Sequence, residues 1–168
     1  AARPEYNEVL ANYADSLLLP RAYLMLGKSQ LNLKNYPQAL KNFRLLIEES
    51  PDAREAPEAR YLVAKTLQQQ GKWQAAYLAY EETDLYHPMS SFAKKSRLAI
   101  NALKKAHRKK LPRFKASAEA LFKKGMTYFE QDDFESFSEL RKKSGIQIVG
   151  DDLTVTNVSR IKMAVDKG

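Results

Sequence analysis

The sequence predicts an all-α protein made of stacked antiparallel helix hairpins. Two stretches of the chain superimpose at a constant shift of 37 residues, and small, large, small, aromatic and helix-breaking residues recur in that order. The matched pairs are Gly27 and Ala64, Tyr36 and Trp73, Ala39 and Ala76, Phe43 and Tyr80, and Pro51 and Pro88. A fixed-period echo is typical of stacked repeats. Such repeats usually hold partners rather than perform chemistry.

Each matched position has a steric reason. Small residues at Gly27 and Ala39 let two antiparallel helices approach closely, and Tyr36 can cover the open end of the pair. Phe43 follows Ala39 by four residues, so both lie on one face of the second helix. Pro51 stops that helix because its ring nitrogen carries no N–H.

The helices are expected in a fixed order along the chain. The first hairpin occupies 20–53 and the second 57–88, followed by a basic helix at 90–110 and a degenerate hairpin at 115–144. Within these hairpins we expect helices at 21–34, 37–49, 57–70, 73–86, 115–130 and 133–143. Gly71 suits a helix C-terminal cap, and Asp132 or Asp133 can cap the helix that follows.

Two end segments complete the predicted single domain of residues 1–168. Within 1–19 we expect a leading helix with one apolar face, formed by Tyr6, Leu10, Tyr13 and Leu17. The tail, 145–168, holds a β-prone run followed by a Val- and Thr-rich stretch. This tail could be the first half of a further unit.

The repeated residues resemble those of the tetratricopeptide repeat family. The first copy carries Tyr23, Leu26, Gly27, Tyr36, Ala39, Phe43 and Pro51, and the second carries Val63, Ala64, Gly71, Trp73, Ala76, Tyr80 and Pro88. The resemblance implies a right-handed superhelix whose concave face takes an extended peptide or a helix of a protein partner.

A third copy is weaker. It keeps Gly125, Tyr128 and Phe134, but Phe137 stands where a small residue belongs and Arg141 where the aromatic belongs. We therefore expect its second helix to pack differently or to end the array.

The linker at 50–57 makes the period three residues longer than the usual 34. Its pattern resembles repeats of bacterial envelope proteins, among them the helical superhelix of soluble lytic transglycosylases. The resemblance implies a periplasmic or cell-envelope location. It also leaves an alternative function, the non-catalytic superhelical portion of a cell-wall lytic transglycosylase whose catalytic domain would follow Gly168.

Composition excludes several classes. The 168 residues are 44% hydrophobic and 29% charged, which is ordinary for a soluble globular domain. Because the chain has no cysteine, disulfides and thiolate metal sites are excluded. No apolar run reaches the length needed to span a membrane.

The net charge of +8 comes from one region, because residues 85–115 hold ten basic side chains and no acidic one. We expect an exposed arc that could bind an anionic polymer or, less readily, nucleic acid through 94–115. Its members are Lys94, Arg97, Lys104, Lys105 and Arg108, with Leu98 among them. The arc expected to pack inward holds Phe92, Ala99, Leu103 and Ala106.

Candidate catalytic residues are few. His87 and His107 lack a second ligand at metal-binding spacing, so a structural role is favoured for both and no metal or cofactor is predicted. Glu135 is followed by serine, as in lytic transglycosylase catalytic domains, but the glycine-rich motif that should follow is missing. We interpret Glu135 as a first-turn carboxylate stabilised by the helix dipole.

These observations predict a non-catalytic interaction scaffold with a protein or peptide partner. The candidate partner-binding residues are the inward positions of the first helices: Tyr23, Lys28, Arg60, Tyr61, Lys65, Gln68 and Gln69.

Overall fold

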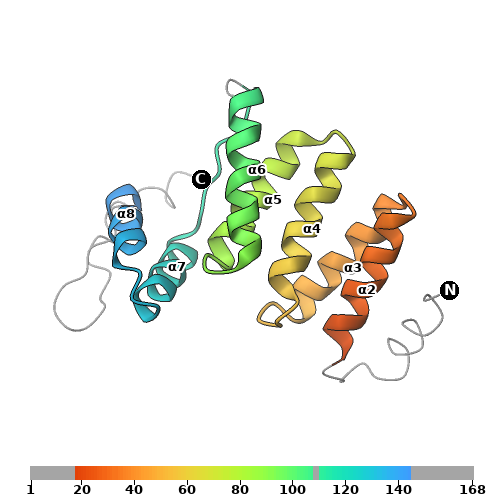
Figure 1. The fold of residues 1–168 in the computed structure, drawn as a ribbon, viewed down its shortest axis with the longest axis horizontal. Helices are drawn as coiled ribbons and strands as arrows, with labels where there is room; N and C mark the ends of the chain where they lie inside the picture. Colours follow the sequence, from red (N-terminus) through yellow and green to blue (C-terminus); the bar gives the residue numbers. More distant parts are fainter. Residues whose placement is uncertain (1–17, 108–109, 145–168) are drawn as a thin grey trace. The chain divides into compact units, whose positions relative to one another are not determined.

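A computed structural model describes residues 18–107 and 110–144, and these residues form seven helices (Figure 1). The helices are α2 (Leu19–Asn32), α3 (Tyr36–Glu49), α4 (Ala56–Gln69), α5 (Trp73–Tyr86), α6 (Ser91–His107), α7 (Ala118–Glu130) and α8 (Phe134–Ser144). The predicted leading helix and the tail at 145–168 lie outside the described residues.

The all-α prediction is confirmed, and the helices pack as sequential antiparallel pairs. The chain divides into two compact units, residues 1–114 and 115–168. In the first unit α2 pairs with α3, α4 pairs with α5, and α6 packs on α5 and less extensively on α4. In the second unit α7 pairs with α8.

All three hairpins turn through the same backbone geometry. Lys34, Gly71 and Asp132 have φ values of 56°, 74° and 55°, and each stands two residues before the second helix of its hairpin. The next N–H in the chain then reaches back five residues: Asn35 donates to Gln30 O, Lys72 to Leu67 O and Asp133 to Tyr128 O, at 2.9–3.0 Å. This is the hydrogen bond of a Schellman C-cap, which satisfies a carbonyl that the helix end would leave unpaired.

The first two hairpins are closed by a small residue set against an aromatic ring. A Cβ added to Gly27 would lie 2.6 Å from Cδ1 of Phe43 and 2.9 Å from its Cζ, so only glycine fits there. In the second hairpin Ala64 and Tyr80 take the same places, and both are buried. The Tyr80 hydroxyl donates a hydrogen bond of 2.8 Å to the side chain of Gln68.

The third hairpin packs differently, as its sequence predicted. A Cβ on Gly125 would meet Phe137 at 3.4 Å and Leu140 at 3.6 Å, which is ordinary van der Waals contact, and Arg141 is exposed. No residue of α8 is buried. The turn is nevertheless well capped, because Asp133 accepts a 3.1 Å hydrogen bond from the backbone N–H of Ser136.

Helix α6 occupies the place of a third first helix. At the same shift of 37, its buried residues match buried residues of α4. The matched pairs are Ala56 and Ala93, Ala59 and Ser96, Val63 and Ile100, and Thr66 and Leu103. One residue of the arc of α6 that was predicted to pack inward, Ala106, is exposed, so that prediction was partly wrong.

No second helix follows α6 within the first unit's described residues. Instead a non-helical stretch packs Leu111 and Phe114 against the hydrophobic core. The Gln74 side chain holds the start of this stretch by donating a 3.0 Å hydrogen bond to Lys110 O. At the end of α6, His107 stacks on Trp73 with ring centroids 4.3 Å apart, so His107 has a packing role.

Candidate partner-binding surface

The first helices α2, α4 and α6 lie side by side, because α4 contacts both of the others (Figure 1). We call the outward side of this layer the first-helix face, and define it on α4 by Glu58, Tyr61, Lys65, Gln68 and Gln69. At 100° per residue these five positions share one arc of α4. The second helices α3 and α5 cover other sides of α2 and α4.

The centre of this face is polar and exposed, and it rests on aromatic rings. Lys65, Gln68 and Gln69 are exposed. Tyr61 is half-buried beneath them, with its ring centroid 5.8 Å from that of Tyr80 and 5.7 Å from that of Phe92 on α6. Tyr61 therefore joins α4 to α5 and α6.

An ion pair joins α2 to the same face. Lys28 Nζ lies 2.5 Å from Glu58 Oε1, and both side chains are partly exposed. Four of the predicted partner-binding residues on α4, together with Lys28 on α2, are therefore brought onto one face.

Tyr23 and Arg60 lie off this face, and their role in partner binding stays a prediction. Tyr23 and Arg60 occupy equivalent positions in the two hairpins, 37 residues apart. Each lies about 100° around its helix from the residue that follows it, Leu24 on α2 and Tyr61 on α4. Burial, followed by the charge and hydrogen bond of Glu49 on α3, raises the pKa of the Tyr23 hydroxyl. This places Tyr23 against the second helix of its own hairpin.

Arg60 has the same position on α4 as Tyr23 has on α2, and its side chain also points toward the second helices. Its guanidinium lies 4.4 Å from the centroid of the Tyr86 ring on α5. Burial lowers the pKa of Arg60, and the nearby Glu82 partly offsets that effect. Arg60 lines a groove of about 340 Å³ between α3 and α5, with Val63 and Leu67 of α4 also on its walls.

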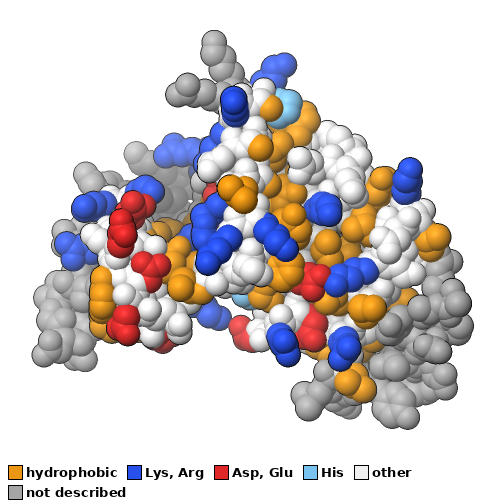
Figure 2. Space-filling view, viewed as in Figure 1, with side chains coloured by type: hydrophobic (Ala, Val, Ile, Leu, Met, Phe, Trp, Pro, Cys, Tyr) orange, Lys and Arg blue, Asp and Glu red, His pale blue; other side chains and the backbone are white. Residues whose placement is uncertain are grey.

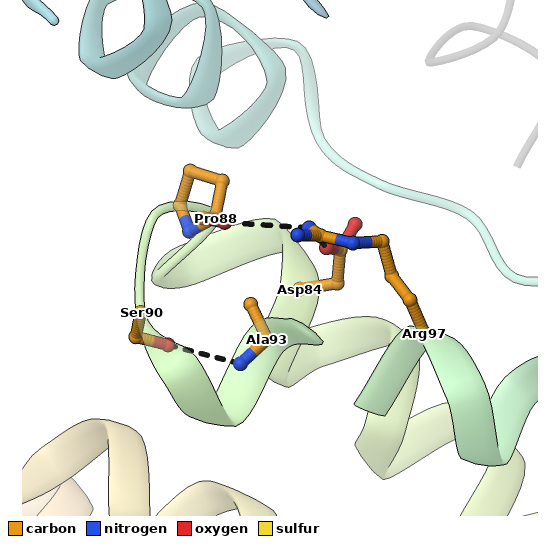
Figure 3. Close-up of polar contacts among 5 residues, drawn as sticks. All are labelled: Asp84, Pro88, Ser90, Ala93 and Arg97. Atoms are coloured by element: carbon orange, nitrogen blue, oxygen red, sulfur yellow. Dashed lines mark hydrogen bonds and ion pairs between the residues drawn. The ribbon is translucent and has the colours of Figure 1, made fainter. Parts of the chain in front are cut away.

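Two residues of the predicted basic arc are tied to α5. Arg97 donates from Nη1 to the Asp84 carboxylate and, at 3.3 Å, to Pro88 O (Figure 3). Lys104 Nζ lies 3.3 Å from Glu81 Oε1. Next to the first of these pairs, the Ser90 hydroxyl caps α6 by accepting a 3.0 Å hydrogen bond from the Ala93 N–H.

Two of the remaining members of the arc are exposed. Lys94 and Lys105 stand on the outer side of α6 with Leu98, and Arg108 lies outside the described residues. Figure 2 shows Lys and Arg side chains gathered over α6. Lys95, which was not among the predicted residues of the arc, is also exposed, and its Nζ lies 4.9 Å from the centroid of the Phe92 ring.

Residues 18–107 and 110–144 hold no group of three or more His, Asp or Glu side chains placed to bind a metal ion. None of the helices in these residues is long and apolar enough to cross a membrane.

Comparison with known families supports the repeat. Residues 21–53 match the tetratricopeptide repeat family. This stretch contains all of α2 but its first two residues, the whole of α3 and their Schellman turn, so the match covers nearly all of one hairpin.

A second match is to enolase, C-terminal TIM barrel domain, over residues 123–168. Its described part, 123–144, contains an antiparallel helix hairpin and no strand, and the rest lies outside the described residues. A TIM barrel alternates strands and helices over about 250 residues. A match of this length therefore assigns neither a barrel nor an activity to the chain.

Proposed function

We propose that this chain is a non-catalytic scaffold that holds a segment of a protein partner against the first-helix face. The observation that carries the proposal is the arc of α4. There Lys65, Gln68 and Gln69 are exposed, while Tyr61 and Phe92 form a firm aromatic base. None of the three exposed side chains is needed to fill the core, so they are available to a ligand.

The chemistry of the face suits a peptide. Amide groups of glutamine both donate and accept hydrogen bonds, as a peptide backbone requires. The Tyr80 hydroxyl already holds Gln68 Oε1, which reduces the side-chain entropy that binding would otherwise cost. Lys28 and Glu58 add one charge of each sign at the α2 edge.

The test is a peptide-display selection against the whole chain. Selected peptides should lose binding to a Lys65→Glu/Gln69→Ala variant, by about tenfold or more if the face is the site. The matched control is Lys41→Glu/Gln38→Ala, which makes the same changes at exposed positions of α3. Equal loss in both variants, or no enrichment over a bare support, would contradict the proposal.

The compartment belongs to the same proposal. The linker pattern at 50–57 supports a periplasmic or cell-envelope location. Fractionation of cells that express the complete gene, followed by immunodetection, tests it, and recovery with the cytosolic fraction would refute it.

A further inference from the structure

Helix α6 takes the place of a first helix, and no second helix follows it among the described residues of its unit. In the two complete hairpins of its unit, α3 packs on α2 and α5 packs on α4. By contrast, among the described helices of its unit, α6 makes its main contacts with α5 and α4 on one side. We call its outer side the α6 ridge and define it by Lys94, Leu98, Asn101 and Lys105, all of them exposed.

The ridge has the spacing of a helix-packing seam. Its residues follow one another at intervals of four, three and four. Intervals that alternate between four and three residues are those of the a and d positions along which two helices pack. From Lys94 to Lys105 the ridge is about 16 Å long at 1.5 Å per residue, which is three turns of a partner helix.

The chemistry of the ridge is one leucine between lysines. Leu98 is 72% exposed, more than any other large hydrophobic side chain of the described residues. Lys94 precedes it by one turn, Lys105 follows by two turns, and Lys95 lies beside it. No acidic residue occurs anywhere in 85–115.

Within residues 18–107 and 110–144, no ion pair neutralises the positive charge of the ridge. Among residues 18–107 and 110–144, the ion pairs of α6 are made by Arg97 with Asp84 and by Lys104 with Glu81. Both pairs bind α6 to α5. Lys94 and Lys105 make no ion pair within those same residues.

We infer that the α6 ridge binds an acidic amphipathic helix of a protein partner. The partner helix places an apolar residue against Leu98 and carboxylates opposite Lys94 and Lys105. Charge complementarity selects an acidic partner, and the seam spacing selects a helix rather than an extended chain. The inference rests on the proposed scaffold function and names the partner's class, but it uses a different helix from the α4 arc.

Other anionic ligands fit the ridge less well. A membrane-surface helix buries a row of apolar side chains in the lipid, whereas this ridge offers only Leu98. Single-stranded nucleic acid is held by exposed aromatic rings beside the charges, and the ridge has none.

The experiment uses the full chain and a synthetic probe. The probe is a fluorescein-labelled, alanine-rich helical peptide of about 20 residues, long enough to cover the ridge. It carries a leucine flanked by glutamates one turn before and two turns after, and a second peptide has lysines in place of the glutamates. Anisotropy titrations at two salt concentrations give the affinities, and circular dichroism checks that each variant is folded.

The expected results separate the ridge from general charge. Lys94→Glu/Lys105→Glu should weaken binding of the acidic probe by about tenfold or more and strengthen binding of the lysine peptide. Leu98→Ala should weaken the acidic probe by about fivefold, because its apolar contact is lost. Lys41→Glu/Lys72→Glu changes the net charge equally at exposed sites elsewhere and should stay within about twofold of the unmodified chain.

Four results would overturn the inference. These are an equal loss in the Lys41/Lys72 control, equal binding of unstructured polyglutamate, and ridge-dependent binding to phosphatidylglycerol vesicles in place of the probe. The fourth is a dimer that the Lys94/Lys105 variant dissociates in sedimentation, which would make a second copy the occupant. Failure of the proposed function would give a different result. In that case the Lys65→Glu/Gln69→Ala variant would still bind the displayed peptides, while binding of the acidic probe would still depend on the ridge.

Discussion

The first hairpin, α2 with α3, and the last, α7 with α8, close with the same turn but pack to different degrees. Lys34 and Asp132 have nearly the same positive φ, and the same hydrogen bond follows each. Yet Phe43 is fully buried against Gly27, whereas Phe137 is only half-buried opposite Gly125. The turn therefore makes the hairpin antiparallel, while the contact between glycine and the ring sets how tightly its helices pack.

The largest expected difference comes from removing the rings. Phe43→Ala should destabilise the first unit by about 3–5 kcal/mol, because it empties a fully buried site. Phe137→Ala should cost its hairpin about 1 kcal/mol, since less buried area is lost. Hydrogen exchange of the full chain, read separately for α2–α3 and for α7–α8, measures both.

Two outcomes check this pair of substitutions. Exchange in α7–α8 should be unaffected by Phe43→Ala if the two units unfold independently. Similar losses at the two sites would show that α8 depends on its aromatic contact as much as α3 does.

Adding one methyl group to each glycine should give effects of opposite sign. Gly27→Ala should destabilise the first hairpin by about 1–3 kcal/mol, because the new Cβ overlaps a buried ring that cannot retreat. Gly125→Ala should stabilise α7 by roughly 0.5–1 kcal/mol, because alanine favours helix and its Cβ meets only ordinary contacts. Urea unfolding followed by hydrogen exchange reports both, and a stable Gly27→Ala variant would refute the close-contact argument.

A smaller effect separates the first two hairpins, where Tyr80 replaces Phe43 at the shift of 37. Tyr80→Phe should cost about 0.5–1.5 kcal/mol at neutral pH, because the hydrogen bond to Gln68 is lost. Burial, with a further contribution from Tyr61, raises the pKa of Tyr80 above the usual value of about 10. The folded chain then keeps the Tyr80 proton where the unfolded chain loses it, so the contribution of Tyr80 to stability is constant below about pH 10 and falls above it.

The pH series provides the control for this substitution. Tyr80→Phe should reduce the alkaline loss of stability without abolishing it, since burial also raises the pKa of Tyr77. Thermal unfolding between pH 8 and pH 11 measures the slope, and an unchanged slope in the variant would contradict the argument.

Much of the fold could be predicted because it depends on local pattern. The close approach of the two helices of a hairpin was predicted from the small residues Gly27 and Ala39, and the helix bounds were predicted to within a few residues. The contact of Gly27 with the Phe43 ring was not predicted. The orientation of Arg60 was missed although its helix was correct. Long amphipathic side chains reveal their direction only when the neighbouring helix supplies a partner, here Tyr86 and Glu82.

The candidate site was less predictable for a related reason. The sequence showed a basic arc on α6, but not that Arg97 and Lys104 are tied to acids of α5. Their partners lie 13 and 23 residues earlier in the chain, so only the packing of α6 on α5 brings them together. The ion pairs place Arg97 and Lys104 on the side of α6 that faces α5. This separates them from the α6 ridge around Leu98, a distinction that the sequence alone does not show.

Each hairpin of a helical array packs on its neighbours, so a helix at the edge of the array has one side that no neighbour covers. The buried residues of α6 and its ion pairs to Asp84 and Glu81 hold this helix against its unit, with no further helix over its outer side among the described residues of that unit. A partner that bound the ridge as we propose would therefore be able to leave again without unfolding the helices beneath it.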